Sequence, residues 1–474
     1  MKSKERARSG PLYPPEPPVN PFQTKWTGAT RHETDEEKEI RIRMMAEAVK
    51  TSKEIDQFLL EGKKALERRR KAIKILLLGQ SESGKSSVLK NFQIAFAPKL
   101  FDSERPAWKV IIQLNVIATI KTILDALKEE FDPEDRGYPS TPSDATNSPA
   151  LRTLRRLRLS LSPLLLIESN LIKILAPECT DSRDLSVRAG NGWKTLLRQK
   201  GPVPRNSAGS VNSLGRRPSH GVITQENDPT SVLSAQRDDI INMWKSREVQ
   251  DILRRRRPRL ELVPGFFMDD LERIAVMDYV PTDSDIIRAR MKTIGVEEHQ
   301  FKVEQGSESS SEFYITDVGG TRNQRASWAP FFDDVQAILF LAPLAFNQNL
   351  EEDPKTNRLE DSLNLWKDIC GNRLLSNANL ILFFNKKDVL EATLAAGVQI
   401  RKYVKTYADL PNDVPTATKY FRDKFRIIHK KLSAEPRPFI CHETSAIDIK
   451  SMSVLLIGVR ESILRQNLRD GDII

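Results

Sequence analysis

The sequence predicts an α/β fold with a mostly parallel sheet, an inserted all-helical domain and a long N-terminal helix. Short, nearly all-apolar runs, typical of parallel strands buried on both faces, recur at 71–79, 335–342, 379–385 and 437–446. Helical patterns separate these runs, as in a parallel α/β sheet. The strand signal disappears between Pro98 and about Pro281, where helical patterns dominate.

The N-terminal part divides into two segments of different character. Residues 1–33 include PLYPPEPP and few residues of the buried type, so we expect a disordered tail there. Residues 34–70 lack proline and begin with Thr34 and Glu37 at capping-box spacing, which predicts one long helix. Its apolar stripe is compatible with packing either on a partner protein or on the chain's own domain. The stripe consists of Ile40, Met44, Ala48, Ile55, Leu59 and Leu66.

At 474 residues the chain is too long for one hydrophobic core, so we expect at least two domains plus segments outside them. The strand pattern assigns 71–97 and 286–474 to the α/β domain, which ends in a helix near the C-terminus. The helical patterns assign 98–285 to the inserted domain. Within that domain, residues 132–235 are rich in Ser, Pro, Asn and Arg, which predicts a disordered insertion with one short helix around 161–176.

Composition limits the classes of function. The formal charge of +10 suits nucleic acid, an anionic membrane or simply scattered solvated charge. Basic residues cluster at 152–158 and 254–257, so a uniform nucleic-acid surface is not expected. The three cysteines, Cys179, Cys370 and Cys441, lack metal-ligand spacing and favour a reducing compartment. No apolar run approaches the roughly 20 residues of a transmembrane helix, so we expect a soluble protein.

A phosphate-binding pattern follows the first predicted strand. GQSESGKSS (79–87) matches G-x-x-x-x-G-K-[ST] between a strand and a helix, where backbone N–H groups wrap phosphates and the helix N-terminus adds positive charge. Lys85 would reach the terminal phosphates, and Ser86 would bind Mg²⁺. By itself, such a stretch is also compatible with a glycine-rich turn.

Three further motifs end later strands. DVGG (317–320) places the Asp317 carboxylate where it can act on the metal shell, although an Asp before two glycines is often a plain turn. NKKD (385–388) ends a strand where open α/β sheets bind ligands. Asp388 can accept hydrogen bonds from N1–H and the 2-amino group of guanine, a pair that adenine lacks. TSA (444–446) adds a base contact through the Ala446 N–H.

In this order and spacing, the four motifs match the GTPase superfamily. Within it, the chain closely resembles heterotrimeric G-protein α subunits outside residues 1–33 and 132–235. IIRARMKTIGVEE resembles their first switch, DVGGTRNQRASW their second switch and QNLRDGDII their C-terminal tail. The resemblance implies a P-loop GTPase (Ras-like) domain with an inserted helical domain.

The resemblance also implies the roles of individual residues. Arg290 corresponds to the arginine finger supplied in cis, and Thr293 joins Ser86 on Mg²⁺. The catalytic positions would be Arg290, Thr321 and Lys85. Residues implied in binding GTP or GDP are Gly79, Glu82, Ser83, Gly84, Lys85, Ser86, Ser87, Ile287, Arg288, Arg290, Thr293, Asp317, Gly319, Gly320, Asn385, Lys386, Asp388 and Ala446.

The function implied is a GTP/GDP switch that transduces receptor signals. Its partners would be a βγ dimer, an effector and a seven-transmembrane receptor contacted by the C-terminal helix and tail, with no nucleic acid. We expect a cytoplasmic protein, peripheral at the inner face of the plasma membrane as part of a heterotrimer. Lys2 follows Met1 and no cysteine precedes Cys179, so membrane association would come through partners. A non-hydrolysing GTP-binding module and an ATP-dependent kinase or ATPase are the alternatives.

The sequence departs from the family at several positions. Thr321 stands where the family has the Gln that orients the attacking water, and Ser81 replaces a glycine of the phosphate loop. Both predict slow hydrolysis. Leu262 and Val263 stand where the family has polar residues facing the nucleotide, which predicts a weaker clamp between the domains. Ser219 follows two arginines, as in basophilic kinase sites, although such matches are often unused.

Overall fold

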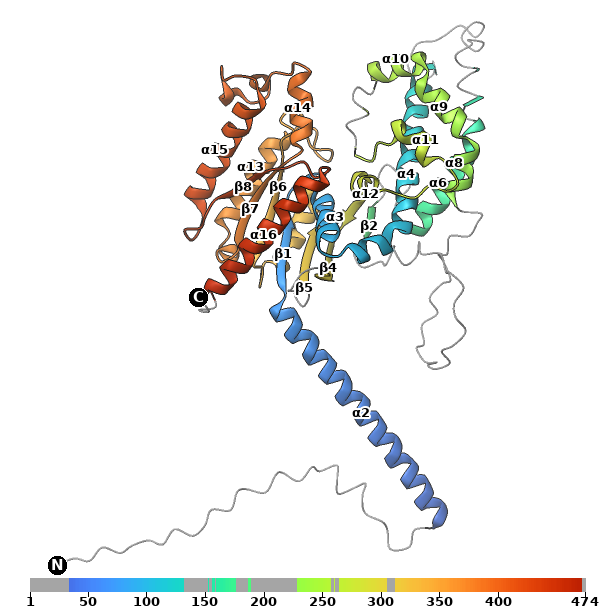
Figure 1. Cartoon of the computed structure of the whole chain (residues 1–474), viewed down its shortest axis with the longest axis vertical. Coiled ribbons are helices and arrows are strands. Elements are labelled where there is room, and N and C mark those ends of the chain that lie inside the picture. Colours follow the sequence, from blue (N-terminus) through green and yellow to red (C-terminus); the bar gives the residue numbers. More distant parts are fainter. Residues whose placement is uncertain are drawn as a thin grey trace, which may run out of the picture. The chain divides into compact units, whose positions relative to one another are not determined.

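The computed structural model describes residues 34–131, 152, 156–157, 159–175, 186–188, 228–256, 260, 264–304 and 312–470 (Figure 1). It divides after Lys71 into two compact units, which are described separately. Several predictions lie outside the described residues: the tail at 1–33, most of the insertion at 132–235 including Ser219, the positions of Leu262 and Val263, and the last four residues.

The first unit contains the predicted N-terminal helix, α2 (Asp35–Lys71). Five of the six predicted apolar residues of its stripe are large, and all five have exposed side chains: Ile40, Met44, Ile55, Leu59 and Leu66. Phe58 is the most exposed large apolar side chain of this helix, at 75%. An apolar surface of this kind is typical of a contact face.

The second unit is built on a six-stranded sheet in the order β4-β5-β1-β6-β7-β8. All neighbouring strands are parallel except β4 and β5, which are antiparallel, so the sheet is mostly parallel as predicted. Strands β5, β6 and β7 are buried along their whole length, which explains their apolar runs. The strands are β1 (Ile73–Leu78), β4 (Val296–Lys302), β5 (Glu312–Val318), β6 (Ala337–Pro343), β7 (Asn379–Asn385) and β8 (Ile440–Glu443).

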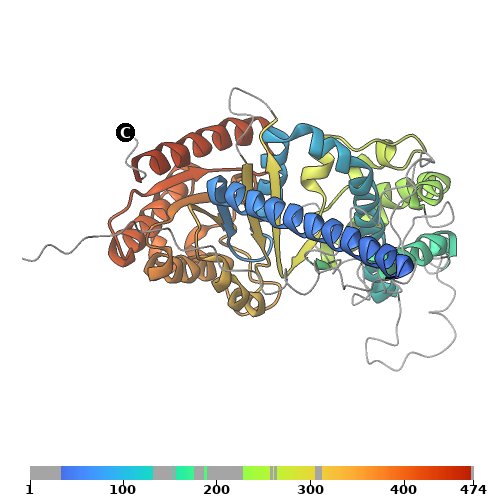
Figure 2. The same ribbon diagram turned by 90° about the horizontal axis from the view of Figure 1, so that it is seen from below.

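Helices cover both faces of this sheet (Figure 2). Alternate side chains of β1 point to opposite faces, so Ile75 and Leu77 pack with α3 and α16, whereas Leu76 and Leu78 join the core under α13 and α15. These helices are α3 (Lys85–Phe96), α13 (Arg358–Gly371), α14 (Lys387–Ala395), α15 (Val414–Leu432) and α16 (Ile449–Asp470). The shorter 3₁₀ turns are η7 (Arg322–Phe331), η8 (Arg373–Leu375), η9 (Ile400–Lys402) and η10 (Lys405–Tyr407).

The described residues between α3 and β3 (Lys292–Ile294) are mostly helical and have their own hydrophobic core. That core gathers residues from Phe101 to Ala289 and is separate from the two cores beside the sheet. The predicted boundaries at 98 and 285 therefore stay our proposal for the inserted domain. Its helices are α4 (Pro98–Phe131), α6 (Ser162–Leu175), α8 (Pro229–Ala235), α9 (Arg237–Lys245), α10 (Arg247–Arg256), η6 (Met268–Asp270), α11 (Leu271–Ile274) and α12 (Asp283–Arg288).

Helix α4 is more apolar than the sequence analysis allowed. Among the described residues, its Pro98–Glu130 stretch is the one helix long and apolar enough to cross a membrane, and 78% of its most apolar window is buried inside the structure. Gln113 and Asn115 interrupt the apolar run without abolishing its high mean hydropathy of 1.7. Burial of this extent is typical of a core helix in a soluble domain.

A short strand lies where the sequence predicted none. β2 (Ser186–Arg188) belongs to the predicted insertion and pairs in parallel with β3 (Lys292–Ile294), so that Val187 lies opposite Thr293. The prediction that 98–281 lacks strands is wrong at this point. Three residues carry no measurable period-2 alternation, and the pairing depends on a distant segment, so local pattern could not reveal it.

Candidate nucleotide-binding site

A cavity of about 600 Å³ lies at the carboxyl ends of β1, β5 and β7, where open α/β sheets bind ligands. The phosphate loop, the segment after α12, the start of η7 and the loop after β8 all contribute to its wall. Trp108 and Phe266 close it from the helical region. Every residue predicted to bind nucleotide or act in catalysis lines this cavity except Gly79, whose carbonyl accepts from Lys85 Nζ.

The phosphate loop turns sharply between β1 and α3. Gly84 has φ +99°, a left-handed conformation that side chains rarely adopt. A Cβ at this position would lie 2.2 Å from Asn385 Nδ2, which donates to the Ser83 carbonyl at 2.7 Å. Only glycine therefore allows the loop to approach the end of β7 so closely.

Lys85 is buried beneath this loop. Its Nζ donates to the carbonyl oxygens of Gly79 and Gln80, both at 2.9 Å. Burial lowers the pKa of Lys85 to about 8, although Asp317 acts in the opposite direction. The ammonium group is thus held by weak neutral acceptors that a phosphate could replace.

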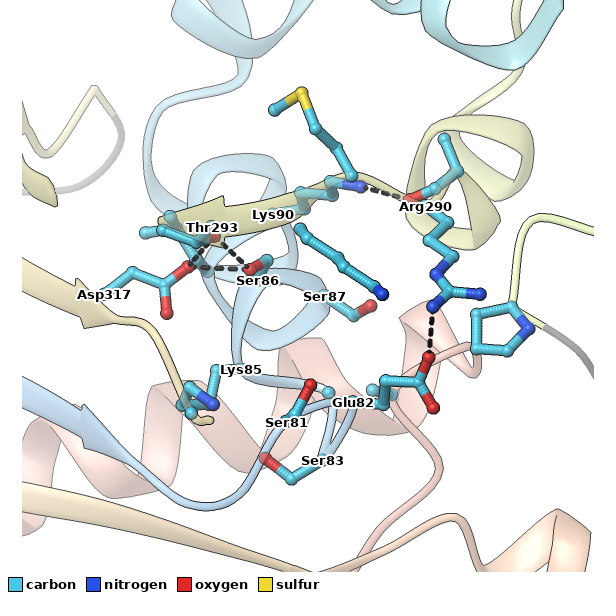
Figure 3. A pocket seen from close by; sticks show the side chains of 18 of the residues that line it. Ser81, Glu82, Ser83, Lys85, Ser86, Ser87, Lys90, Arg290, Thr293 and Asp317 are labelled. Carbon is cyan, nitrogen blue, oxygen red and sulfur yellow. Dashed lines mark hydrogen bonds and ion pairs between the residues drawn. The ribbon is translucent and has the colours of Figure 1, made fainter. Parts of the chain in front are cut away.

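Three side-chain oxygens converge beside the phosphate loop (Figure 3). Ser86 Oγ donates to Asp317 Oδ2 at 2.7 Å and lies 3.4 Å from Thr293 Oγ1. The second Asp317 oxygen is buried without a hydrogen-bond partner, and burial raises the pKa of this carboxyl group. Hydroxyl and carboxylate oxygens suit Mg²⁺, which binds few protein ligands together with substrate phosphates, so these residues fit that ion.

Both the guanidinium group and the backbone of Arg290 are bound by neighbouring residues. Its Nη2 pairs with Glu82 Oε1 at 2.6 Å (Figure 3) and with Glu351 Oε2 at 3.4 Å. Asn115 of α4 accepts from the Arg290 N–H at 2.8 Å and donates to its carbonyl at 3.0 Å. Burial by itself would raise the pKa of Glu82, but Arg290 and Arg358 lower it overall. The arginine therefore faces the cavity as the partner of a phosphate-loop carboxylate.

The nearby residues Ile287 and Arg288 form hydrogen bonds to other segments of the chain. The Arg288 guanidinium donates to Asp270 at 2.9 Å and to the Phe266 carbonyl at 2.8 Å, both in the helical region. The Ile287 carbonyl accepts from Ser87 Oγ at 3.4 Å. The Ser87 bond connects the phosphate loop to the segment that carries Arg290, and the Arg288 bonds connect that segment to the helical region.

The NKKD and TSA segments meet at the other end of the cavity. Asp388 Oδ1 accepts from Ser445 Oγ at 2.7 Å, which orients the carboxylate. The Ala446 N–H donates to Asn385 Oδ1 at 2.9 Å, so this donor is already engaged within the protein. A bond from Ala446 to a base would have to be shared with Asn385. Burial lowers the pKa of Lys386 to about 8, with Glu82 acting against it.

The second switch packs against the phosphate loop. A Cβ on Gly320 would lie 2.5 Å from the backbone nitrogen of Ser81, so the two segments are in close contact. Trp328 Nε1 donates to the Gly319 carbonyl at 2.9 Å. Thr321 precedes η7 without making a side-chain capping bond.

Sequence reasoning missed four residues that shape this site: Asn115, Gln324, Arg358 and Lys90. Arg358 donates to the Ser81 carbonyl and pairs with Glu82, both at 2.8 Å. Lys90 donates to the carbonyls of Ile286 and Ala289, and its Nζ lies 4.0 Å from the centre of the Trp108 ring. In the sequence, the polar Asn115 interrupts the apolar pattern of its helix, and this was the only sign that it contributes to the site.

Comparisons with known proteins agree with this geometry. The profile of the family described as "G-protein alpha subunit" matches residues 49–463. The guanine nucleotide-binding protein alpha-4 subunit of Mycosarcoma maydis is 30% identical over 84% of this chain and 83% of its own length. The alpha-13 subunit of Mus musculus is 29% identical over 90% and 92%. The G(o) alpha subunit of Geodia cydonium is 28% identical over 85% and 90%.

Proposed function

Because this chain belongs to the G-protein alpha subunit family of GTPases that switch between GTP and GDP, we propose that its own switch turns over slowly. The observation that carries the proposal is Thr321, which lines the cavity at the position of the family's Gln. A Thr side chain is too short to contact a water and the γ-phosphate together. Hydrolysis in this chain would then depend on Arg290, the phosphate loop and the metal site.

The phosphate loop would hold the β- and γ-phosphates through its backbone N–H groups and Lys85. Family members use Mg²⁺ with the nucleotide. Ser86 and Thr293 would bind the ion, and Asp317 would orient its bound water; when bound, the ion neutralises phosphate charge. In support, these three side chains already converge within 3.5 Å of one another.

Arg290 would stabilise charge on the γ-phosphoryl oxygens during transfer to water. To do so it must exchange Glu82 for the phosphate, because its Nη2 now lies 2.6 Å from Glu82 Oε1. Arg358 offers Glu82 a second cation at 2.8 Å, so the carboxylate stays paired when Arg290 moves. This exchange couples the arginine to the γ-phosphate of the bound nucleotide.

Asp388 would select guanine, and its exchange for Asn tests this. Asp388→Asn should weaken GTP binding by roughly 1–3 kcal/mol, because a paired acceptor becomes a mismatched donor, and should favour xanthosine triphosphate. Ser445→Ala is the matched control, since it removes only the orienting bond to Asp388. Unchanged GTP affinity in Asp388→Asn, or equal binding of GTP and ATP by the native chain, would contradict the assignment.

Single-turnover decay of bound GTP tests the slow switch. G-protein α subunits with their arginine in cis are known to hydrolyse GTP at about 10⁻² s⁻¹. We expect a lower rate here, and almost none in Arg290→Ala. A native rate equal to the family value would contradict slow turnover. A complete absence of hydrolysis would instead indicate a non-hydrolysing module.

The family interacts with βγ dimers and receptors and is generally peripheral at membranes. We propose that α2, together with Arg322 to Trp328 of the second switch, contacts a βγ-like partner, and that α16 faces a receptor. The partner would also bring the chain to the inner face of the plasma membrane. Deletion of residues 1–60 should abolish capture of the GDP-bound chain by βγ, whereas deletion of residues 1–33 should not. Equal capture of both would contradict this role of α2.

A further inference from the structure

Gln324 lines the same cavity as Thr321 and is three residues further along the chain. The Gln324 N–H donates to the Thr321 carbonyl at 3.0 Å, which closes the first turn of the 3₁₀ helix η7. Residues three apart share a face in this type of helix, so Gln324 is brought to the side on which Thr321 meets the cavity. The Gln324 side chain therefore starts from a position close to that of the shorter Thr321 side chain.

The Gln324 amide oxygen is buried and has no hydrogen-bond partner. Among the described residues lining the cavity, only three side-chain oxygens have this property: Ser83 Oγ, Asp317 Oδ1 and Gln324 Oε1. Ser83 belongs to the phosphate loop, and Asp317 to the metal side. Among the described residues that line the cavity, the oxygen of Gln324 is thus the one such acceptor on η7, and a buried acceptor of this kind is normally paired when the site is filled.

Neighbouring bonds hold Gln324 against the start of the second switch. A Cβ placed on Gly319 would lie 2.0 Å from Gln324 Oε1, so the amide group packs directly on the Gly319 backbone. Later in the same helix, Arg325 pairs with Asp361 at 2.6 Å, and Trp328 donates to the Gly319 carbonyl at 2.9 Å. These contacts fix the turn from which Gln324 projects.

We propose that Gln324 positions the attacking water in this chain, in place of the Gln that Thr321 replaces. The inference rests on the proposed slow switch and accounts for the hydrolysis that remains although Thr321 replaces the family's Gln. Its amide oxygen would accept one hydrogen bond from the water, and its NH₂ group would donate to a γ-phosphoryl oxygen. The water oxygen bonds to the γ-phosphorus as the bond to the β–γ bridging oxygen breaks, and GDP leaves with that electron pair. The water proton passes to phosphate and solvent, since an amide is not a base.

Single-turnover hydrolysis in four proteins tests this role: the native chain, Gln324→Met, Thr321→Gln and the double variant. Methionine keeps the length of the side chain but removes both polar groups. In the native background we expect Gln324→Met to slow hydrolysis at least about tenfold, with unchanged affinity for GTP and GDP. In the Thr321→Gln background the same change should have little effect, because the new Gln then orients the water.

Comparing Gln324→Met in the native and the Thr321→Gln backgrounds distinguishes a water-positioning role of Gln324 from a purely structural one. A purely structural role of Gln324 would reduce the rate equally in both backgrounds and would overturn the proposal. Asn323→Met is the matched control, since Asn323 is exposed on the same helix and does not line the cavity. An unchanged rate in Gln324→Met would overturn only the role of Gln324. A native chain that hydrolyses no GTP would overturn both the slow hydrolysis and the role of Gln324.

Discussion

Asn115 binds both backbone polar groups of Arg290, with its Oδ1 accepting at 2.8 Å and its Nδ2 donating at 3.0 Å. Asn115 belongs to helix α4 of the helical region, whereas Arg290 lies two residues before β3. Gly265 makes room for this contact, because a Cβ there would lie 2.9 Å from both Asn115 Oδ1 and Arg290 Cβ. The helical region thereby fixes the backbone of the residue proposed to act on the γ-phosphate.

We expect Asn115→Leu to slow GTP hydrolysis more than it weakens GTP binding. The change keeps the volume but leaves the Arg290 N–H and carbonyl unpaired, at a cost of roughly 1–3 kcal/mol. Gln113→Leu is a matched control two residues away, where the side chain bonds to Thr230 and not to Arg290. Hydrolysis measured in a single turnover should distinguish them, and equal rates in the two variants would contradict the role of Asn115.

The pKa of Lys85 predicts how nucleotide affinity changes with pH. In the nucleotide-free protein this pKa is about 8, and bound phosphate raises it by favouring the ammonium form. Affinity should therefore be nearly constant below about pH 8 and fall up to tenfold per pH unit above it. Calorimetry should detect proton uptake on binding near about pH 9, and a flat affinity profile there would contradict this reading.

Gly84→Ala should abolish nucleotide binding. The new Cβ would require a left-handed φ of +99° and would lie 2.2 Å from Asn385 Nδ2, breaking the bond from Asn385 to the phosphate loop. Gly458→Ala is the control, because no atom lies within 4 Å of its Cβ position on helix α16. There, alanine should stabilise the protein by about 0.5–1 kcal/mol. Retained GTP binding in Gly84→Ala would contradict the argument.

The sequence predicts the parallel core of this fold because those strands are buried on both faces. β6 and β7 have no exposed residue, and their apolar runs reflect this directly. β4 is different: its exposed and half-buried positions at the sheet edge leave no such run. Its antiparallel pairing with β5 was therefore not predicted, and the short pairing of β2 with β3 depends on contacts distant in sequence.

The residues of the candidate site also divide into those that the sequence identifies and those that it does not. Lys85, Ser86 and Asp388 stand in motifs whose spacing is set by a strand, a turn and a helix N-terminus, so local sequence identifies them. Asn115 bonds to the Arg290 backbone, which only the tertiary fold brings near, and no motif marks it. Gln324 stands within DVGGTRNQRASW, but the motif does not show that its amide oxygen is buried without a partner beside Gly319.

The pairing of β2 with β3 predicts that the insertion protects the first switch. Val187→Pro removes an N–H from β2 and should disrupt a parallel ladder of three residue pairs. Amide hydrogen exchange over 292–294 should then become faster in the GDP-bound protein. Val187→Ala retains the N–H and serves as control. If exchange over these residues is the same in both variants, the pairing does not restrain the first switch.

Thr321 and Ser81 both line the cavity, so we expect both to affect turnover. Ser81 is also crowded, since its backbone nitrogen lies 2.5 Å from the Cβ position of Gly320 and its carbonyl accepts from Arg358 at 2.8 Å. A loss of roughly 2–3 kcal/mol of transition-state stabilisation would lower the rate about 30- to 150-fold.

Thr321→Gln combined with Ser81→Gly should therefore hydrolyse bound GTP much faster than the native chain. Thr321→Gln supplies an amide at the water, and Ser81→Gly removes a side chain from the crowded loop. Each single variant shows which change matters, and Arg290→Ala in the restored background should remove the gain, since the arginine acts on the same transition state. If restoration leaves the rate unchanged, neither Thr321 nor Ser81 limits hydrolysis, and another group positions the water, as proposed for Gln324.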